Sequence, residues 1–216
     1  LEIIQKEVNR NPFKNKNIPK TENLSLTKEQ QKAMNKIEGA INDKIFKEFL
    51  IHRSNTDHGK TEIYLQLIGK VLEKGKTAIV LVPEISLTPQ MVDRFIARFG
   101  EEKIALLHSK LSVGERYDEW KRIEKGEAKI VIGARSAIFA PLDDLGIIII
   151  DEEHDTSYKS DMTPKYNAKE IALYLAKQRN IPLVLGSATP DISTYYRLEK
   201  EDGILTLSER AGNSSL

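Results

Sequence analysis

The sequence predicts an α/β fold in which a mostly parallel β-sheet carries helices on both faces. Short apolar runs rich in β-branched residues alternate with amphipathic stretches of helical length between residues 49 and 200. A strand inside a parallel sheet is buried on both sides, so it forms a continuous apolar run rather than an alternating one. The 216 residues suffice for one domain of this class with a tail, and a second complete domain would be crowded.

Composition narrows the classes of protein to consider. The 33 basic and 32 acidic side chains leave a formal net charge of +1, so any nucleic-acid site must be local. The chain has no Cys, which excludes a disulfide framework, a thiolate nucleophile and a cysteine-ligated zinc within it and suits the cytoplasm. The apolar run 147–150 is far shorter than the ~20 residues of a membrane-spanning helix, so we expect a soluble protein without a membrane partner.

The first 25 residues are expected to form a linker. They contain basic residues, Pro12, Pro19 and several Asn, and they show no sustained apolar period. Because the chain lacks an initiator Met and ends abruptly, we expect a fragment of a longer protein, with a globular domain at 26–216. That domain opens with Thr27-Lys28-Glu29-Gln30, a capping box, followed by apolar residues at helical spacing.

The remaining elements follow in order along the chain. Strands are expected at the apolar runs, which lie at 49–51, 78–82, 104–107, 130–132, 146–150 and 183–185. Helices are expected at the amphipathic stretches between them, which lie at 60–73, 88–99, 112–124, 167–178 and 191–200. Ligands of such sheets bind beyond the carboxyl ends of the strands, so residues directly after each apolar run are the candidate site residues.

The segment after the first strand ends in Gly59-Lys60-Thr61 and is followed by a helix. This ending matches the second half of a phosphate-binding loop, where backbone N–H groups and the Lys hold phosphates and the Thr hydroxyl ligates Mg²⁺. The first half does not match, because Ser54 replaces the first Gly, and Asp57 and His58 occupy positions that are usually small. By itself, the segment is equally compatible with a nucleotide site and with an ordinary helix start.

Two further strand ends carry polar residues. The run 146–150 is followed by Asp151-Glu152-Glu153-His154, which would place one carboxylate near a phosphate-bound Mg²⁺ and the next near an attacking water. The alternative is a solvated acidic turn. The run 183–185 is followed by Gly186-Ser187-Ala188-Thr189-Pro190, whose hydroxyl groups suit a relay between two ligands but also suit a common strand-to-helix turn.

These three segments, in this order and spacing, resemble motifs I, II and III of the superfamily 2 helicases. Three more segments are similar to those of the bacterial replication-restart helicases, and they lie at 81–90, 108–116 and 131–141. The resemblance runs from about Leu26 to Gly212 and implies a RecA-like P-loop NTPase lobe.

The resemblance implies a site for ATP and Mg²⁺. Gly59, Lys60 and Thr61 would hold the nucleotide phosphates, Thr61 and Asp151 the Mg²⁺, and Glu152 the attacking water. Gln30 resembles the Gln that reads adenine upstream of motif I in related helicases, although it equally completes the capping box. Three residues would couple hydrolysis to DNA contact, namely His154, Ser187 and Thr189.

The resemblance also implies a DNA-tracking surface, in which strand-end loops contact phosphates without reading sequence. Its residues on these loops are Pro83, Glu84, Ser86, Thr88, Arg135 and Ser136. The loop between motifs II and III resembles an aromatic-rich loop that couples DNA contact to hydrolysis, with base-stacking and phosphate-binding side chains at Tyr158, Lys159, Lys165 and Tyr166. The alternatives are that Ser136 caps a helix and that the tyrosines pack on the domain.

Members of this family are longer than the present chain. They carry an N-terminal DNA-binding region, a cysteine-rich zinc module and a second lobe that supplies an arginine to the transition state, so we expect little hydrolysis by this lobe alone. Single-strand binding protein and primosome proteins are the implied partners, and 3′-to-5′ unwinding is the implied polarity. Residues Arg53 to His58 replace the usual glycines, so this loop has an unusual shape or the site is weakened.

Three hypotheses follow for function. The first is an ATP-fuelled DNA translocase lobe of a cytoplasmic replication-restart helicase. The second is a DNA- or protein-binding module whose nucleotide site has decayed. The third, a small-molecule kinase that uses the same loop, is disfavoured because motifs II and III occur together.

Overall fold

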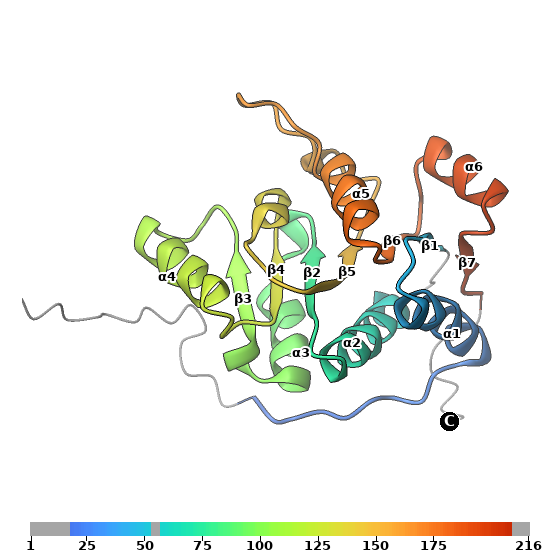
Figure 1. The fold of residues 1–216 in the computed structure, drawn as a ribbon, viewed down its shortest axis with the longest axis horizontal. Coiled ribbons are helices and arrows are strands. Elements are labelled where there is room, and N and C mark those ends of the chain that lie inside the picture. The colour runs from blue at the N-terminus through green and yellow to red at the C-terminus, as the bar shows by residue number, and fades with distance from the viewer. Residues whose placement is uncertain (1–17, 53–56, 209–216) are drawn as a thin grey trace, which may run out of the picture.

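The computed structural model describes residues 18–52 and 57–208, and its strands form one sheet with helices on both sides (Figure 1). Within the described residues the sheet has seven strands in the order β3-β4-β2-β5-β6-β1-β7, and every pairing is parallel. The strands are β1 Glu48–His52, β2 Thr77–Leu81, β3 Ile104–Leu107, β4 Ile130–Gly133, β5 Leu145–Ile150, β6 Leu183–Ser187 and β7 Ile204–Thr206. The predicted parallel sheet is therefore confirmed, and β7 is an addition that the sequence did not predict.

Six α-helices cover the sheet in the described part of the chain. They are α1 Lys28–Asp43, α2 Asp57–Glu73, α3 Pro89–Phe99, α4 Val113–Glu124, α5 Ala168–Arg179 and α6 Ile192–Lys200. Short 3-10 helices occupy several connections, at Glu84–Ser86, Glu101–Lys103, Arg135–Phe139 and Thr156–Tyr158. The helices expected from the amphipathic stretches are all present, with ends that differ by a few residues.

Alternate residues of each central strand face different helices. In β5, Ile147 and Ile149 belong to the buried cluster that also contains residues of α1, α2 and α3, whereas Ile148 and Ile150 belong to the cluster that contains residues of α4, α5 and α6. All four side chains are fully buried. A fully buried Ile contributes about 1.5–3 kcal/mol by leaving water, so both faces stabilise the sheet and the strand is apolar throughout.

The helix starts are fixed by local side-chain caps. Thr27 accepts a hydrogen bond from the backbone of Gln30, and the Gln30 side chain accepts one from the backbone of Thr27, so the predicted capping box is confirmed. Thr88 caps α3 by accepting a hydrogen bond from the backbone of Met91, with Pro89 at the first helical position. Ser112 and Glu115 form a second capping box at α4. Since a cap typically contributes ~1 kcal/mol, these residues fix where each of the three helices begins.

Part of the predicted linker packs on the domain. The backbone of Thr21 donates to Ala97 of α3 at 2.9 Å, and the backbone of Leu24 donates to Glu62 of α2 at 3.0 Å. Glu62 also forms a buried ion pair with Arg98, so the segment lies over a contact between two helices. Residues 1–17 of the predicted linker lie outside the described residues.

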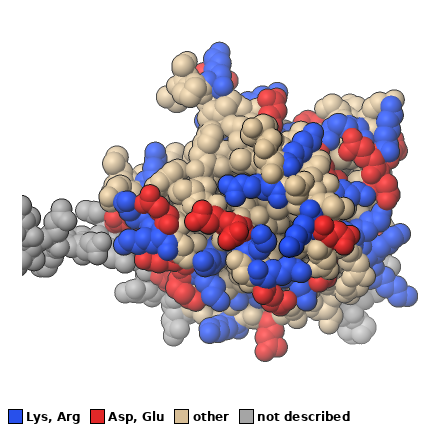
Figure 2. Space-filling model, in the orientation of Figure 1, with Lys and Arg blue, Asp and Glu red and all other residues tan. Residues whose placement is uncertain are grey.

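Charges of both signs are mixed on the face of the molecule that Figure 2 shows. Basic and acidic side chains are interspersed there, which fits the near-cancellation of charge in the sequence. In the described part of the chain, no helix combines the length and the apolar character that crossing a membrane requires.

Candidate nucleotide site and adjoining surface

The carboxyl ends of three neighbouring strands bring the predicted motifs together. Strands β5, β6 and β1 are adjacent in the sheet, and motif II, motif III and the phosphate loop follow them in that order. The N-terminal turns of α2 carry Lys60 and Thr61 at this edge. The predicted loop residues 53–56 lie outside the described residues. The rest of the predicted site therefore forms one cluster, as the parallel topology requires.

Lys60 is the centre of this cluster. Its side chain is 3% exposed, and its Nζ lies 2.8 Å from Glu152 Oε1 and 3.5 Å from Asp151 Oδ1. Burial alone would lower the pKa of Lys60, but the charges of Asp151 and Glu152 outweigh it and raise the pKa above its ordinary value. The ammonium is therefore held charged between two carboxylates, where it could exchange one of them for a phosphate oxygen.

Asp151 is partly buried, and its side chain is 24% exposed. Burial raises the pKa of its carboxyl group, although the charge of Lys60 opposes that shift. Tyr64 of α2 donates its hydroxyl hydrogen to Asp151 Oδ1 at 2.9 Å. The next residue, Glu152, has a φ angle of 46°, in the left-handed region that non-glycine residues seldom adopt. Such backbone strain clusters at functional sites, because the surrounding structure must hold the residue in place.

The predicted coupling residues are also brought together. His154 Nδ1 lies 2.7 Å from Ser187 Oγ, and that same oxygen accepts a hydrogen bond from the backbone of Thr189 at 3.1 Å. His154 Nδ1 also lies 3.7 Å from Glu152 Oε2. A chain of polar contacts therefore runs from motif III to the carboxylate that would orient water, which is the arrangement a relay needs.

Gln30 contacts the phosphate loop as well as capping α1. Its Nε2 donates to the carbonyl oxygen of Gly59 at 3.0 Å, while its Oε1 accepts from the backbone of Thr27 at 2.8 Å. The side chain is buried. The Gln30 amide therefore completes the capping box and also contacts the first turn of α2, which carries Lys60.

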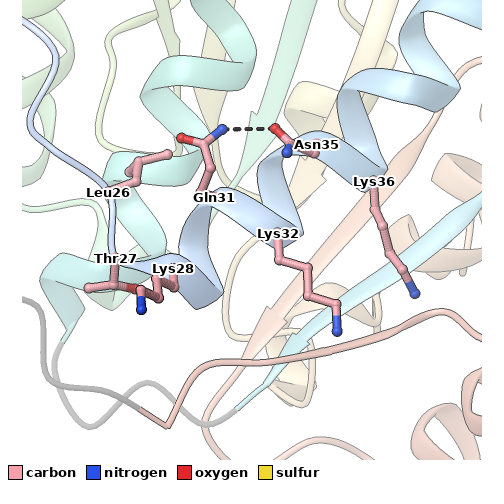
Figure 3. A pocket seen from close by; sticks show the side chains of 7 residues that line it. All are labelled: Leu26, Thr27, Lys28, Gln31, Lys32, Asn35 and Lys36. Atoms are coloured by element: carbon pink, nitrogen blue, oxygen red, sulfur yellow. Dashed lines mark hydrogen bonds between the residues drawn. The ribbon is translucent and has the colours of Figure 1, made fainter.

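A hollow of about 690 Å³ lies along the exposed side of α1 (Figure 3). It is lined by Leu26, Thr27, Lys28, Gln31, Lys32, Asn35 and Lys36. Gln31 and Asn35 hydrogen-bond to each other at 2.8 Å, and the three lysines follow one another along the helix. Lys36 is paired with Asp202 at 2.9 Å. The hollow adjoins the first turn of α1, on which Gln30 contacts the phosphate loop.

Glu153 is a residue whose role the sequence did not reveal. Its side chain is completely buried, and its Oε2 lies 2.6 Å from Lys169 Nζ of α5. Its Oε1 accepts from the backbone of Asp191, just before α6, at 2.7 Å. Its own backbone N–H donates to Gly186 at 2.9 Å. Glu153 therefore fastens motif II to motif III and to two helices. The only hint in the sequence is Lys169, a basic residue 16 positions later on the next helix, with which Glu153 could pair.

Several predicted DNA-binding residues surround a second hollow of about 550 Å³. The predicted residues that line it are Glu84, Arg135, Ser136, Lys159 and Tyr166, and they are joined by Ser109 and Arg116, which were not predicted. The other predicted residues on these loops, outside that lining, are Pro83, Ser86, Thr88, Tyr158 and Lys165. Ser136 lies within a 3-10 helix and is not its cap, since the N-cap is Ala134.

Glu84 brings negative charge to this hollow. Its carboxylate accepts hydrogen bonds from the hydroxyl and the backbone of Ser109, the latter at 3.0 Å. The hydroxyl bond is the main reason that the pKa of Glu84 is lowered, so the group stays ionised. A charged carboxylate repels phosphate, and Glu84 is therefore better suited to positioning Ser109 than to holding a DNA backbone directly.

Tyr158 corrects the prediction of a base-stacking face. Its ring is 1% exposed and packs in the core with α5. Its hydroxyl lies 2.5 Å from the carbonyl oxygen of Asp151 and 3.2 Å from that of Leu81. Because both faces of the ring are covered, Tyr158 offers no surface to a base, and the alternative of a tyrosine packed on the domain holds at this position.

Arg135 and Tyr166 connect the aromatic loop to the end of β4. The Arg135 guanidinium donates to the carbonyl oxygens of Ser157, at 3.2 Å, and Lys159. It also stacks over the Tyr166 ring, 5.7 Å from its centroid, and that ring meets Phe139 edge to face. Tyr166 is partly exposed, so the ring that could meet a base is held by an arginine that could meet a phosphate.

Comparison with known proteins decides the family. The model of the DEAD/DEAH box helicase family matches residues 27–198. The chain belongs to the DEAD/DEAH box helicase family. Within it, replication restart protein PriA of Bacillus subtilis is 56% identical over 194 residues, which cover 90% of this chain and 24% of that protein. PriA of Synechocystis sp. is 51% identical over 72% of this chain and 18% of that protein. The resemblance to replication-restart helicases is thereby confirmed.

The helicase chain spans about a quarter of the length of the PriA proteins that it matches. Among solved structures, RecG bound to a three-way DNA junction is similar with a TM-score of 0.62 and 21% identity, covering 91% of this chain and 27% of that one. This likeness concerns the fold. It confirms the predicted RecA-like fold, which corresponds to about a quarter of the RecG chain.

Proposed function

We propose that this chain is the ATP-binding motor lobe of an ATP-dependent 3′-to-5′ DNA helicase that restarts stalled replication forks. Residues 26–216 would form the lobe, and residues 1–25 would connect it to a DNA-binding region. The support is the family of the chain, together with its identity to proteins named for replication restart.

One observation carries the nucleotide site: the ammonium of Lys60 lies 2.8 Å from Glu152 and 3.5 Å from Asp151. A buried cation beside two carboxylates at a helix N-terminus is suited to a polyanion with a bound metal ion. The helicase family implies ATP and Mg²⁺. Oxygen ligands such as the Thr61 hydroxyl and the Asp151 carboxylate are those that Mg²⁺ prefers, so the residues present fit the ion.

Each of these groups has a distinct task in hydrolysis. Lys60 would bind phosphate oxygens, and Gly59 and Thr61 would hold them at the start of α2. Glu152 would orient a water and accept its proton, since phosphoryl transfer depends on positioning and on charge stabilisation. Mg²⁺, when bound, would neutralise part of the negative charge of the phosphates. The His154–Ser187 contact would then transmit changes at this site to motif III.

The DNA would lie over the hollow that contains Arg135 and Tyr166. Arginine and lysine side chains bind phosphates without regard to sequence, and an exposed aromatic ring stacks on any base. The aromatic loop joins this hollow to Asp151 through Tyr158. Such a connection would let DNA binding affect hydrolysis.

Other properties of the proposed motor belong to the whole protein. Single-strand binding protein and primosome proteins are its proposed partners, and the bacterial cytoplasm is its proposed location. Zinc would be bound only in a cysteine-rich module elsewhere, since this chain has no Cys. A second lobe would supply an arginine worth ~10³–10⁵ in rate, so the isolated lobe would bind ATP and hydrolyse little.

A titration with a fluorescent ATP analogue, with and without Mg²⁺, tests the proposal. We expect saturable, Mg²⁺-dependent binding that is lost in Lys60→Ala and kept in Lys70→Ala, an exposed position on the same helix. In the full-length protein, DNA should stimulate ATP hydrolysis and Glu152→Gln should abolish it. The alternative is a binding module with a decayed nucleotide site. It would be supported if the full-length protein bound no ATP and if its DNA binding were the same in wild type, Lys60→Ala and Glu152→Gln.

A further inference from the structure

Tyr64 connects three motifs of the proposed ATP site. It lies in α2, one helical turn after Lys60, and its side chain is buried. Its hydroxyl donates to Asp151 Oδ1 of motif II at 2.9 Å. On its other side the hydroxyl approaches Gly186, the residue directly before Ser187 of motif III. One phenol group therefore meets the segment after β5 and the carboxyl end of β6, from the helix that carries Lys60.

Gly186 is required by this approach. A Cβ atom added there would lie 1.7 Å from the Tyr64 hydroxyl oxygen and 2.8 Å from Asp151 Oδ1. A spacing of 1.7 Å is far below any non-bonded contact, so the hydroxyl and a side chain at position 186 exclude each other. The absence of a side chain at Gly186 thus leaves room for the hydroxyl.

Packing alone does not account for a tyrosine at this position. A phenylalanine would fill the same apolar space, whereas a buried hydroxyl without a partner would cost free energy. Here the partner is a carboxylate that also contacts Lys60 through the same oxygen, Oδ1, at 3.5 Å. A carboxylate oxygen only accepts hydrogen bonds, so the Tyr64 hydroxyl is the donor in this contact.

We propose that Tyr64 is a positioning residue, which fixes the orientation of the Asp151 carboxylate toward Mg²⁺ and for which Gly186 leaves space. The inference rests on the proposed function, because Asp151 is there a ligand of Mg²⁺. Two contacts on Oδ1, from Tyr64 and from Lys60, determine the rotation of the carboxylate and therefore the direction of its second oxygen. Groups that orient a metal ligand in this way affect metal affinity by about 10–100-fold.

The first test is Tyr64→Phe, with the binding of a fluorescent ATP analogue measured across a series of Mg²⁺ concentrations. We expect the half-saturating Mg²⁺ concentration to rise about 10-fold, while binding of the analogue without Mg²⁺ stays unchanged. A purely structural role would weaken both. The control is Tyr174→Phe, an exposed tyrosine of α5, which should change neither quantity.

The second test concerns the space at Gly186 and needs no nucleotide. Gly186→Ala should lower the melting temperature strongly, and the double variant Gly186→Ala, Tyr64→Phe should recover part of that loss, because the phenyl ring lacks the clashing oxygen. Equal losses in the single and double variants would refute the exclusion between the two residues.

The outcomes separate this inference from the proposed function. If wild-type protein binds the analogue with Mg²⁺ dependence and Tyr64→Phe shows the same dependence, the positioning role is wrong and the ATP site stands. If the wild-type full-length protein binds no ATP analogue, the proposed function is wrong and the positioning role falls with it.

Discussion

The hydroxyl of Tyr158 lies 2.5 Å from the backbone carbonyl oxygen of Asp151. Asp151 follows β5 directly, and Tyr158 ends a 3-10 helix in the loop that leads toward the proposed DNA surface. The same hydroxyl lies 3.2 Å from the carbonyl oxygen of Leu81, at the end of β2. The loop is thus fastened to the strand ends of the proposed ATP site by a buried side chain, and its motion would be transmitted to Asp151.

Tyr158→Phe should therefore reduce stability and leave DNA contact largely intact. Loss of a buried hydroxyl that serves backbone carbonyls should lower the free energy of unfolding by about 1–2 kcal/mol in a urea titration. Tyr196→Phe, at an exposed position, should change it by less than about 0.5 kcal/mol. If Tyr158→Ala weakened binding of single-stranded DNA as much as Tyr166→Ala, with stability unchanged, the Tyr158 ring would be a stacking surface after all.

The case of Tyr158 indicates where sequence reasoning reached its limit. The four consecutive isoleucines of β5 predicted a strand buried on both faces, and the strand has that form. In the loop after motif II, two tyrosines are eight residues apart, with nothing periodic between them. The direction of each ring depends on contacts with Leu81 and Phe139, which are distant in sequence. Tertiary contact, not local pattern, decides which tyrosine is exposed.

Arg135 should contribute to DNA affinity and to the order of the aromatic loop. Arg135→Ala removes one cation, so the salt dependence of single-stranded DNA binding should fall by about 0.7 in log–log slope. Arg135→Lys keeps the charge and the slope, but it loses the planar group that spans two carbonyls and stacks on Tyr166. Trypsin should then cleave faster at Lys159.

The control for Arg135 is Arg179→Ala. Arg179 is the exposed last residue of α5, just before the start of β6 and therefore away from the carboxyl ends of the strands. It should leave both the slope and the cleavage rate as in the wild type. An unchanged salt slope in Arg135→Ala would show that this guanidinium does not meet phosphate, whatever its effect on the loop.

Glu153 and Lys169 should form an energetically important buried pair. Removing one partner of a fully buried pair costs about 3–5 kcal/mol where the remaining charge loses its compensation, but the Lys169 side chain is 21% exposed and keeps its ion pair with Asp191 at 2.8 Å. We therefore expect Glu153→Ala to lose less than that, and Glu153→Gln to lose least, because its amide oxygen can still accept from the backbone of Asp191. Urea unfolding measures both. Equal stability of Glu153→Ala and wild type would contradict the role of this pair.

The same pair predicts a change at alkaline pH. Burial alone would lower the pKa of Lys169, but hydrogen bonds to Asp191 and Glu153 outweigh it and raise the pKa above 10.5. Stability from this ammonium is then fully present below pH 10.5 and is lost as pH rises through the raised value. The difference in unfolding free energy between wild type and Lys169→Met should therefore be constant from pH 7 to pH 10 and shrink above it.

The site itself was predictable to the extent that topology determines it. Residues directly after β5 and β6 had to meet the start of α2, because parallel strands share one edge, and this placed Lys60 beside Asp151 and Glu152. Tyr64 and Gly186 escaped notice because a tyrosine on a helix and a glycine after a strand each have ordinary explanations. Only the 1.7 Å spacing between the hydroxyl oxygen and an added Cβ reveals that they depend on each other.

Gln30 permits the last prediction, because its two contacts can be separated by substitution. Gln30→Glu keeps an oxygen that accepts from the backbone of Thr27, so the capping box survives, but it cannot donate to the carbonyl oxygen of Gly59. Gln30→Ala loses both contacts. Both variants should bind the ATP analogue more weakly than wild type, since the contact to the phosphate loop is missing in each.

The two variants should differ in their effect on the cap of α1. In a peptide of residues 24–45, Gln30→Ala should lower helicity by circular dichroism, whereas Gln30→Glu should keep it, because a glutamate completes a capping box as a glutamine does. A third measurement compares the binding of ATP with the binding of GTP in wild type and in both variants. If Gln30 also reads adenine, as related helicases suggest, both variants lose that preference; if the preference persists while affinity falls, Gln30 acts through Gly59 alone.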